Sequence, residues 1–233
     1  MADNPRIWAV MPAAGTGSRF GGRLAKQYLT LLDKSVIEHS VLALLACTDI
    51  KAIAVALHED DKIFSTLACA SDPRVLAVLG GRERSDSVER ALAALSDAAE
   101  SDWVLVHDAA RPCVSTNDIQ RLITLGCAHT TGAILAAPMV DTVKRGNEVG
   151  EISATVDRNT LWRAFTPQLF RFGELRDALM HCRERQLAVT DEASAMEHCG
   201  HRPLLVEGSH RNIKITYPDD LAIAAVFLSG DQQ

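Results

Sequence analysis

The sequence predicts an α/β fold built around a mostly parallel sheet. Short runs of β-branched or apolar residues alternate along the chain with segments of helical periodicity, which is the pattern of βα units. A glycine-rich segment directly follows the first of these runs, where a parallel sheet would place a ligand. The composition, with 47% hydrophobic and 23% charged residues over 233 positions, is that of a globular chain long enough to bury a core. We therefore expect residues 1–233 to form a single domain.

The first half of the chain predicts strands and helices in alternation. The predicted strands are short, apolar runs at 7–11, 52–57, 75–79 and 103–107. The predicted helices carry apolar residues at helical spacing and cover 35–47, 60–70 and 87–98. In the first of these helices Val36, Ile37 and Val41 lie on the same side as Leu44 and Leu45. This helix would therefore bury one face against the sheet.

The second half begins in the same way and then departs from it. Ser115, with Asp118 three residues later, resembles a capping box that opens a helix over 115–125, and a strand follows at 133–137. Two short alternating segments come next, at 140–144 and 151–156. Because Gly146-Asn147 and Gly150 lie between them, we expect a β-hairpin arm over 138–159. The α/β pattern then resumes with helices at 173–183 and 191–198, strands at 203–207 and 213–216, and a closing helix from 218.

Charge and apolar patterning exclude several classes of protein. The net charge of −6 gives no overall positive field to attract a nucleic-acid backbone, so we expect no nucleic-acid partner. The longest apolar runs, such as 41–47, fall far short of the roughly 20 residues that cross a bilayer, and the first residues lack the pattern of a secretory signal. The six cysteines are scattered without a C-x-x-C pair, as expected for free thiols in a reducing compartment. We therefore expect a cytoplasmic protein with no membrane partner.

The strongest local signal is the glycine-rich segment 12–20, Pro-Ala-Ala-Gly-Thr-Gly-Ser-Arg-Phe. It is not a dinucleotide fingerprint, because Phe20 stands where the third glycine would be, and it is not a P-loop, because no Gly-Lys-Ser/Thr follows Gly17 at the required spacing. Its small residues expose backbone N–H groups that can surround phosphates. Arg19 and Lys26 then follow as two cations that can stabilise developing negative charge. An ordinary glycine-rich turn is the alternative interpretation.

Two further segments add candidate residues directly after predicted strands. Gly80-Gly81 leads into a helix whose N-terminal backbone donors, together with the Ser87 hydroxyl, can bind a small polar ring. Asp108 follows the next strand and is a candidate metal or ribose ligand, with Arg111 as its ion-pair partner. A purely structural ion pair between Asp108 and Arg111 is the plainer alternative.

Three later side chains complete the set of candidates. Thr166 and Thr190 each offer a hydroxyl near an element boundary, and Lys214 lies on the predicted strand 213–216. Thr190 could equally be a helix N-cap, and Lys214 could be an exposed residue of an edge strand.

The order of these segments is more specific than any one of them. From Pro12 to about Leu221 the chain resembles the 2-C-methyl-D-erythritol 4-phosphate cytidylyltransferases. The motifs that carry the resemblance are K-Q-Y-L at 26–29, G-G-x-x-R-x-x-S-V at 80–88, H-D-A-A-R-P at 107–112, D-T-V-K at 141–144, T-P-Q at 166–168, T-D-E-A-S at 190–194 and N-I-K at 212–214. The resemblance implies a Rossmann-like domain of the glycosyltransferase-A type. It also implies transfer of CMP from CTP to methylerythritol phosphate, with release of pyrophosphate, in the non-mevalonate route to isoprenoids.

The resemblance further implies a set of site residues, a metal and a partner. The residues implied in catalysis are Arg19, Lys26 and Lys214. Those implied in nucleotide binding are Pro12, Ala13, Ala14, Gly15, Thr16, Gly17, Gly81, Arg84, Ser87, Asp108 and Ala109. Those implied in binding the acceptor are Asp108, Arg111, Thr142, Arg158, Thr166, Thr190 and Lys214. The metal would be Mg²⁺ or another divalent cation with Asp108 as its nearest protein ligand. The partner would be a second copy, with interlocked arms that bring Thr142 and Arg158 to the neighbouring acceptor pocket.

Two positions depart from the pattern of this family. Ala25 stands where proline is usual before the K-Q-Y-L lysine, which gives the backbone there more freedom. Arg82 stands where an acidic residue is frequent, and arginine cannot accept a hydrogen bond from a ribose hydroxyl. Three other functions stay open at this point: a ribitol 5-phosphate cytidylyltransferase, a non-catalytic nucleotide-binding module, and a dinucleotide-dependent oxidoreductase, which Phe20 disfavours.

Overall fold

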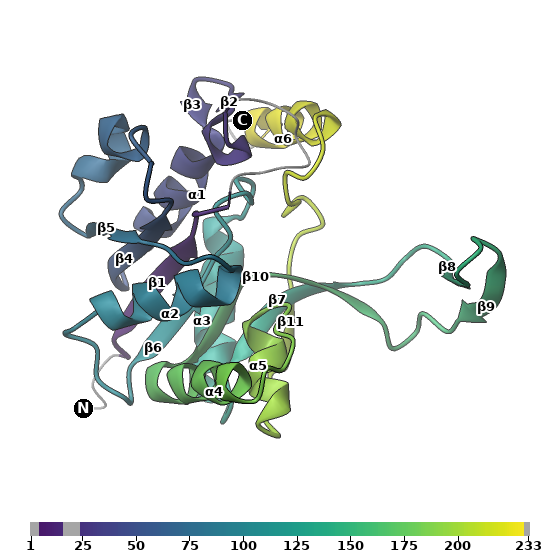
Figure 1. The fold of residues 1–233 in the computed structure, drawn as a ribbon. Coiled ribbons are helices and arrows are strands. Elements are labelled where there is room, and N and C mark those ends of the chain that lie inside the picture. Colours follow the sequence, from purple (N-terminus) through teal and green to yellow (C-terminus); the bar gives the residue numbers. More distant parts are fainter. Residues whose placement is uncertain (1–4, 16–23, 231–233) are drawn as a thin grey trace.

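A computed structural model describes residues 5–15 and 24–230 and has a seven-stranded sheet at its centre (Figure 1). The strand order is β11-β7-β10-β6-β1-β4-β5. The strands are β1 (Ile7–Pro12), β4 (Ile50–Leu57), β5 (Val75–Leu79), β6 (Trp103–Val106), β7 (Ala133–Pro138), β10 (Trp162–Arg171) and β11 (Leu204–Glu207). β10 runs antiparallel to β6 and β7, whereas the other neighbours pair in parallel. The predicted α/β fold with a mostly parallel sheet is confirmed.

Helices cover both faces of this sheet. α1 (Val36–Leu45) and α3 (Thr116–Ala128) contribute to the core on one face, and α2 (Arg84–Ala94), α4 (Phe172–Glu184) and α5 (Glu192–His198) contribute to the core on the other. α6 (Asp219–Gly230) packs beside a small pair of strands, β2 (Thr30–Leu31) and β3 (Lys34–Ser35). A short 3₁₀ turn, η2 (Lys26–Tyr28), precedes that pair.

Strand β1 divides its side chains between the two cores. Ile7, Ala9 and Met11 belong to one core, and Trp8 and Val10 belong to the other. Successive side chains of a strand point to opposite faces, so a strand covered on both sides needs apolar residues at every position. This requirement explains why β1 is one continuous apolar run rather than an alternating one.

Local side chains determine where two helices begin. The Ser115 hydroxyl accepts a hydrogen bond from the Asp118 N–H at 3.1 Å and opens α3, which confirms the predicted cap. At α1 the Glu38 carboxylate accepts from the Ser35 N–H at 3.0 Å. α2 starts at Arg84, three residues earlier than the predicted 87, so Arg84 lies in the first turn of a helix.

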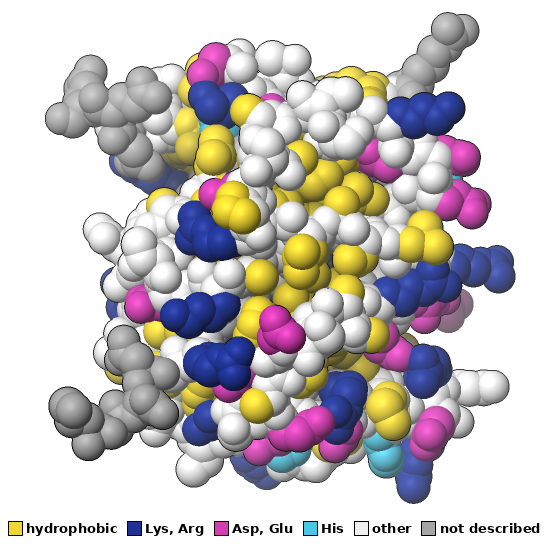
Figure 2. Space-filling view, turned by 90° about the vertical axis from the view of Figure 1, so that its left-hand side faces the viewer, with side chains coloured by type: hydrophobic (Ala, Val, Ile, Leu, Met, Phe, Trp, Pro, Cys, Tyr) yellow, Lys and Arg dark blue, Asp and Glu magenta, His cyan; other side chains and the backbone are white. Residues whose placement is uncertain are grey.

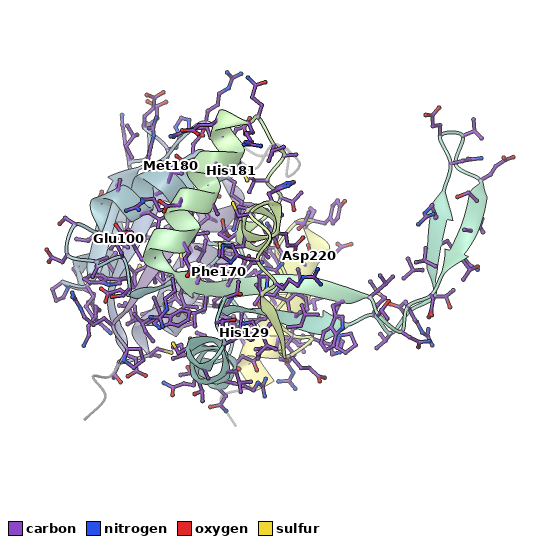
Figure 3. The ribbon with its side chains drawn as sticks, turned by 90° about the horizontal axis from the view of Figure 1, so that it is seen from below. Glu100, His129, Phe170, Met180, His181 and Asp220 are labelled. Atoms are coloured by element: carbon purple, nitrogen blue, oxygen red, sulfur yellow. The ribbon has the colours of Figure 1, made fainter. Side chains whose placement is uncertain are left out.

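The predicted hairpin forms a separate two-stranded sheet outside the main one. Its strands are β8 (Val143–Gly146) and β9 (Ile152–Val156), which pair antiparallel with each other. Figures 1 and 3, two views at right angles, both show this arm projecting away from the body of the protein. Val140 is 62% exposed and Ile152 is 67% exposed, so the arm buries little apolar surface within its own chain.

The helix predicted over 60–70 is wrong. The segment instead forms two 3₁₀ turns, η3 (Phe64–Thr66) and η4 (Ala68–Ser71). The Asp61 carboxylate accepts from the N–H groups of Ile63 and Phe64, both at 3.0 Å, and the Thr66 hydroxyl donates to the Ile63 carbonyl. These local bonds offer the backbone an alternative to helical hydrogen bonding, which the apolar spacing alone does not reveal.

The strand predicted over 213–216 is also wrong, the short pair β2 and β3 was not predicted, and one strand of the main sheet was missed. Residues 213–216 form a loop whose Ile215 N–H donates to the Ala110 carbonyl at 2.8 Å. The missed strand is β10, where Pro167 interrupts the sequence pattern and the pairing with β7 shifts register between Ala164 and Gln168. Proline inside an apolar run argues against a central strand, which is why the sequence did not predict β10.

Apolar side chains are exposed along one edge of the sheet. Figure 2 looks onto the side of the molecule that carries the edge strand β5, and hydrophobic side chains reach the surface there. Leu76 and Leu79 of this strand are 39% and 55% exposed.

Among the described residues there is no helix long and apolar enough to cross a membrane.

Gly132, directly before β7, provides a test of how tightly the sheet is closed. Its φ is +95°, and a Cβ there would lie 2.1 Å from the Leu169 carbonyl oxygen of β10. We expect Gly132→Ala to lower the free energy of unfolding by about 2–5 kcal/mol, because the strain of a positive φ adds to a backbone clash. Gly200→Ala is the matched control, since Gly200 has a φ of +84° and open space around it, and it should lower the same quantity by only about 1 kcal/mol. Equal losses in urea unfolding would contradict the clash.

Candidate active site

A cleft of about 730 Å³ lies at the carboxyl ends of four adjacent parallel strands. Its walls come from the segments that follow β1, β4, β5 and β6, together with η2 and the loop 213–216. The predicted site residues that line it are Pro12, Ala13, Ala14, Gly15, Lys26, Gly81, Arg84, Ser87, Asp108, Ala109 and Lys214. Thr16, Gly17 and Arg19 lie outside the described residues. The structure therefore gathers segments that are up to two hundred positions apart into one concave surface.

The side chain of Gln27 holds residues 12–15 of the glycine-rich segment by hydrogen bonds. The Ala13 N–H donates to the Ala56 carbonyl at 2.8 Å, which continues the pairing of β1 with β4. The Gln27 side-chain amide, which is buried, donates to the carbonyls of Ala13 at 2.9 Å and Gly15 at 3.1 Å. Gln27 was not among the predicted site residues, although it is the second residue of the K-Q-Y-L motif. Its amide ties the strand end to η2 and so places Lys26 at the cleft.

Two glycines shape the second wall of the cleft, and Gly80 lets this wall approach the first. A Cβ at Gly80 would lie 2.6 Å from the Ala14 Cβ, and a Cβ at Gly81 would lie 2.1 Å from the Asp86 Cβ. A side chain at Gly80 would push the two walls apart, and one at Gly81 would clash with the first turn of α2. The Ser87 hydroxyl accepts from the Gly81 N–H at 3.0 Å and donates to the Glu83 carbonyl at 3.1 Å. Ser87 thus orders the wall and lines the cleft.

Asp108 is the electrostatic centre of the site. Its carboxylate is nearly buried, and it accepts from Arg84 Nε at 3.1 Å and from Lys214 Nζ at 2.8 Å, with Arg111 Nε 3.6 Å away. Burial by itself would raise the pKa of this carboxyl. The three cations outweigh burial and hold its pKa well below the ordinary range, so Asp108 is ionised.

Lys26 stands on the same wall as Lys214. Its Nζ donates to the Ile215 carbonyl at 2.8 Å, directly beside Lys214 in the chain. The lysine of η2 is thereby tied to the loop 213–216, which the sequence placed on a strand. Two predicted catalytic lysines, 188 positions apart in the printed sequence, thus share one side of the cleft.

His107 is fully buried behind Asp108 and organises the backbone there. Burial, the largest cause, lowers its pKa from the ordinary 6.5 to about 4, so the imidazole is neutral near pH 7. Its Nε2 lies 3.2 Å from the Arg111 carbonyl, which only accepts, so Nε2 carries the proton. Nδ1 then accepts from the Thr166 hydroxyl at 3.0 Å, and the Thr166 oxygen accepts from the Asp108 N–H at 3.0 Å.

A smaller cavity of about 180 Å³ adjoins the first. Its lining includes six of the predicted acceptor-binding and nucleotide-binding residues: Arg84, Asp108, Arg111, Thr166, Thr190 and Lys214. Arg84, Asp108 and Lys214 line both cavities, so the cluster forms the boundary between them. The two cavities therefore adjoin where Arg84 and Lys214 are fixed, and cations held in this way can stabilise negative charge.

Thr142 and Arg158 are not brought to this site within one chain. Both are exposed and lie at the ends of the arm strands β8 and β9, which project from the body (Figure 1). Arg158 donates to the Val140 carbonyl at 2.6 Å and so closes the base of the arm.

The described carboxylates of the larger cleft can hold a divalent cation only with further ligands from a bound molecule. Asp108 and Glu83 are the carboxylates that line the larger cleft, and both oxygens of Asp108 already accept from cations. A hard cation that prefers six oxygen ligands therefore fits here when phosphate oxygens complete its coordination. His58, Glu59 and Asp60 place ligand atoms within 4.8 Å of one another, but all three are exposed.

Comparisons with known proteins find one family that this chain resembles over almost its whole length. The family described as 2-C-methyl-D-erythritol 4-phosphate cytidylyltransferase, IspD, matches residues 7–230. A protein of that description from Vibrio cholerae is 51% identical over 225 residues, which is 97% of each chain. A solved structure of a Francisella tularensis protein of the same description has a TM-score of 0.83 at 34% identity and covers 95% of this chain and 99% of its own. A solved 4-diphosphocytidyl-2C-methyl-D-erythritol synthase has a TM-score of 0.83 at 38% identity, covering 97% and 99%.

The buried His107 predicts a specific loss of stability in mild acid. Between pH 6.5 and about 4 the unfolded chain takes up a proton at this histidine and the folded chain does not, so stability falls as the pH is lowered. His107→Asn keeps an acceptor for the Thr166 hydroxyl and cannot titrate. We expect the drop in unfolding free energy between pH 7 and 4 to be smaller in this variant by roughly 3 kcal/mol at most.

The exposed His198 serves as the matched control for that measurement. His198→Asn should keep the wild-type pH dependence in urea unfolding followed by circular dichroism. Parallel stability curves for the wild type and His107→Asn across this range would mean that the folded protein protonates His107 as readily as the unfolded chain does.

Proposed function

Because the chain belongs to the 2-C-methyl-D-erythritol 4-phosphate cytidylyltransferase family, it transfers CMP from CTP to that sugar phosphate, and we propose how its residues divide the work. The products are 4-diphosphocytidyl-2-C-methyl-D-erythritol and pyrophosphate, in isoprenoid precursor synthesis. The observation that carries the proposal is the cluster of Arg84, Asp108 and Lys214, which lines both adjoining cavities. We assign the larger cavity to CTP and the smaller one to the acceptor.

The reaction joins two anions and needs charge stabilisation more than proton transfer. An oxygen of the acceptor phosphate forms a bond to the α-phosphorus of CTP, the bond from that phosphorus to the β-phosphate oxygen breaks, and pyrophosphate leaves. The attacking oxygen is already an anion, so no strong general base is required. We propose that Arg19, Lys26 and Lys214 stabilise the charge on the equatorial oxygens. The hydrogen bond from Lys26 Nζ to the Ile215 carbonyl supports this role, because it ties the Lys26 ammonium to the loop that carries Lys214.

We propose that the two close walls of the cleft bind the nucleotide. Backbone groups of Ala13, Ala14 and Gly81, with Ser87 behind them, would contact the cytosine, whose exocyclic amine is a donor where uracil has an acceptor. Asp108 and Ala109 would contact the ribose side. The remaining proposed nucleotide contacts are Pro12, Gly15, Thr16, Gly17 and Arg84.

A divalent ion, which we propose to be Mg²⁺, fits the cleft with Asp108 as a protein ligand and phosphate oxygens supplying the rest. When bound it would neutralise charge on the triphosphate and the leaving pyrophosphate. Since the pKa of Asp108 is held low, this carboxylate stays available as an anion over the whole neutral range. We propose Arg111, Thr166, Thr190 and Lys214 as the acceptor contacts supplied by the same chain.

We propose that residues 1–233 form one nucleotidyltransferase domain that works as a homodimer through the arm at 138–159. Two-stranded hairpins are marginal alone in water, and the exposed Val140, Val149 and Ile152 give this arm apolar surface to bury. Thr142 and Arg158 would then complete the acceptor pocket of the second copy. We also propose a cytoplasmic location, where the scattered cysteines stay reduced.

Pyrophosphate release tests the assignment of the two cavities. We expect release only when CTP and 2-C-methyl-D-erythritol 4-phosphate are both present, and at least about 100-fold lower kcat/KM with UTP than with CTP, since mispaired buried polar groups discriminate strongly. Release with either substrate omitted is the internal control. Equal turnover of CTP and UTP would overturn the proposed base contacts.

Mixing two inactive variants tests whether the arm acts in the second copy. Lys26→Met should lower kcat by roughly 10²–10³, and Arg158→Ala should lower activity through the acceptor pocket. A heterodimer of the two carries one site with both defects and one with neither, so an equal mixture should regain about a quarter of the wild-type sites. The shared site is refuted if activity does not recover after verified subunit exchange. It is also refuted if light scattering shows that the active enzyme is a monomer.

A further inference from the structure

Glu192 is fully buried at the start of α5 and grips Arg84 with both carboxylate oxygens. Arg84 Nη1 donates to Oε1 at 2.7 Å, and Nη2 donates to Oε2 at 3.0 Å. A two-pronged contact of this kind fixes the plane of a guanidinium as well as its position. Arg84 is the first residue of α2, so the contact joins the first turns of two helices that lie 108 positions apart.

The start of α5 is itself anchored to the sheet. The amide of Gln168, which is buried on β10, donates to Asp191 Oδ2 at 2.8 Å, and its oxygen accepts from the Ala193 N–H at 2.8 Å. Asp191 in turn caps the helix by accepting from the Ser194 N–H at 2.9 Å. Glu192 therefore lies between two residues that are tied to the central antiparallel strand, and it can serve as a rigid support.

The third nitrogen of the same guanidinium faces Asp108, between the two cavities. Arg84 Nε donates to Asp108 Oδ1 at 3.1 Å, and Arg84 lines both cavities, whereas Glu192 lines neither of them. Burial disfavours the charged form of Arg84, but Glu192 and Asp108 outweigh that effect and raise its pKa above the ordinary value. Without Glu192, two of the three directional contacts that hold the guanidinium would be lost, and Arg84 could rotate toward either cavity.

We infer that Glu192 is a positioning residue for the transfer reaction: its carboxylate holds Arg84 so that one guanidinium presents a fixed edge to the nucleotide cavity, to the acceptor cavity and to Asp108 between them. This inference rests on the proposed roles of Arg84 and Asp108. Glu192 connects the strand that carries Thr166 and Gln168 to the nucleotide-binding wall, so that the two substrates meet in a preset geometry.

The test compares a neutral and a shortened side chain at this position. Glu192→Gln keeps the shape and removes the charge, and we expect kcat about tenfold lower and KM for each substrate about fivefold higher, because a small misplacement of a positioning group has large effects on rate. Glu192→Asp keeps the charge on a side chain that is one methylene shorter. We expect its changes in kcat and KM to be smaller than those of Glu192→Gln. In an Arg84→Lys background, which has already lost the two-pronged contact, Glu192→Gln should have less than about a twofold further effect.

Glu89→Gln is the matched control, because Glu89 of α2 pairs with Arg183 of α4 away from both cavities. This variant should keep wild-type kcat and KM values. A merely structural role for Glu192 would lower the melting temperature and the fraction of active sites but leave both KM values unchanged, and that result overturns the inference. So does an equal effect of Glu192→Gln in the wild-type and Arg84→Lys backgrounds.

Two further outcomes keep the test decisive. Should Glu192→Gln fail to fold, Glu192→Asp replaces it, and wild-type KM values in that variant reject the positioning role. A wild-type chain that released no pyrophosphate from CTP and the sugar phosphate would instead defeat the proposed function itself, independently of Glu192.

Discussion

The buried carboxylate of Asp108 pairs with Arg111, three residues along the same loop, and with two cations from other parts of the chain. Arg84 comes from the first turn of α2, Arg111 from the loop after β6, and Lys214 from the loop before α6. Removing water from one charge is costly, and only direct pairing offsets that cost, so the position of each cation is tightly specified. The two cavities adjoin where these pairs lie, and the arrangement of the whole site follows from this one anion.

The antiparallel strand β10 gives that cluster its rigid backing. Through Thr166 it supports both the neutral His107 and the backbone of Asp108, and through Gln168 it supports the start of α5. Here one extended segment passes between β6 and β7 and delivers acceptor-side and support residues together.

Unlike β10, the arm formed by β8 and β9 packs against little of its own chain. Its backbone hydrogen bonds are satisfied between β8 and β9, yet Val140, Val149 and Ile152 remain exposed. A hairpin can thus have a defined register without having a buried face. Its apolar residues are consistent with the second copy that we propose, and they contrast with β1, which is covered on both sides.

Local sequence patterns predict most of the secondary structure and the segments that form the cleft. Continuous apolar runs such as β1, the Ser115 cap, and the Gly80-Gly81 pair reflect local requirements of burial, hydrogen bonding and close approach, which are readable within a few residues. The motifs at Asp108, Lys214 and Thr166 likewise indicated candidate residues. Their resemblance to one family is confirmed as membership by the match over residues 7–230.

Which of these residues meet depends on packing between segments that lie far apart in the chain. β10 was missed because Pro167 breaks its local pattern, and pairing with two neighbouring strands outweighs that break. Lys214 reaches Asp108 from a loop rather than a strand, and Gln27 and Glu192 act through partners that no nearby residue reveals. Local sequence sets what each segment can form, whereas the partners of a buried charge depend on which distant segments the sheet brings together.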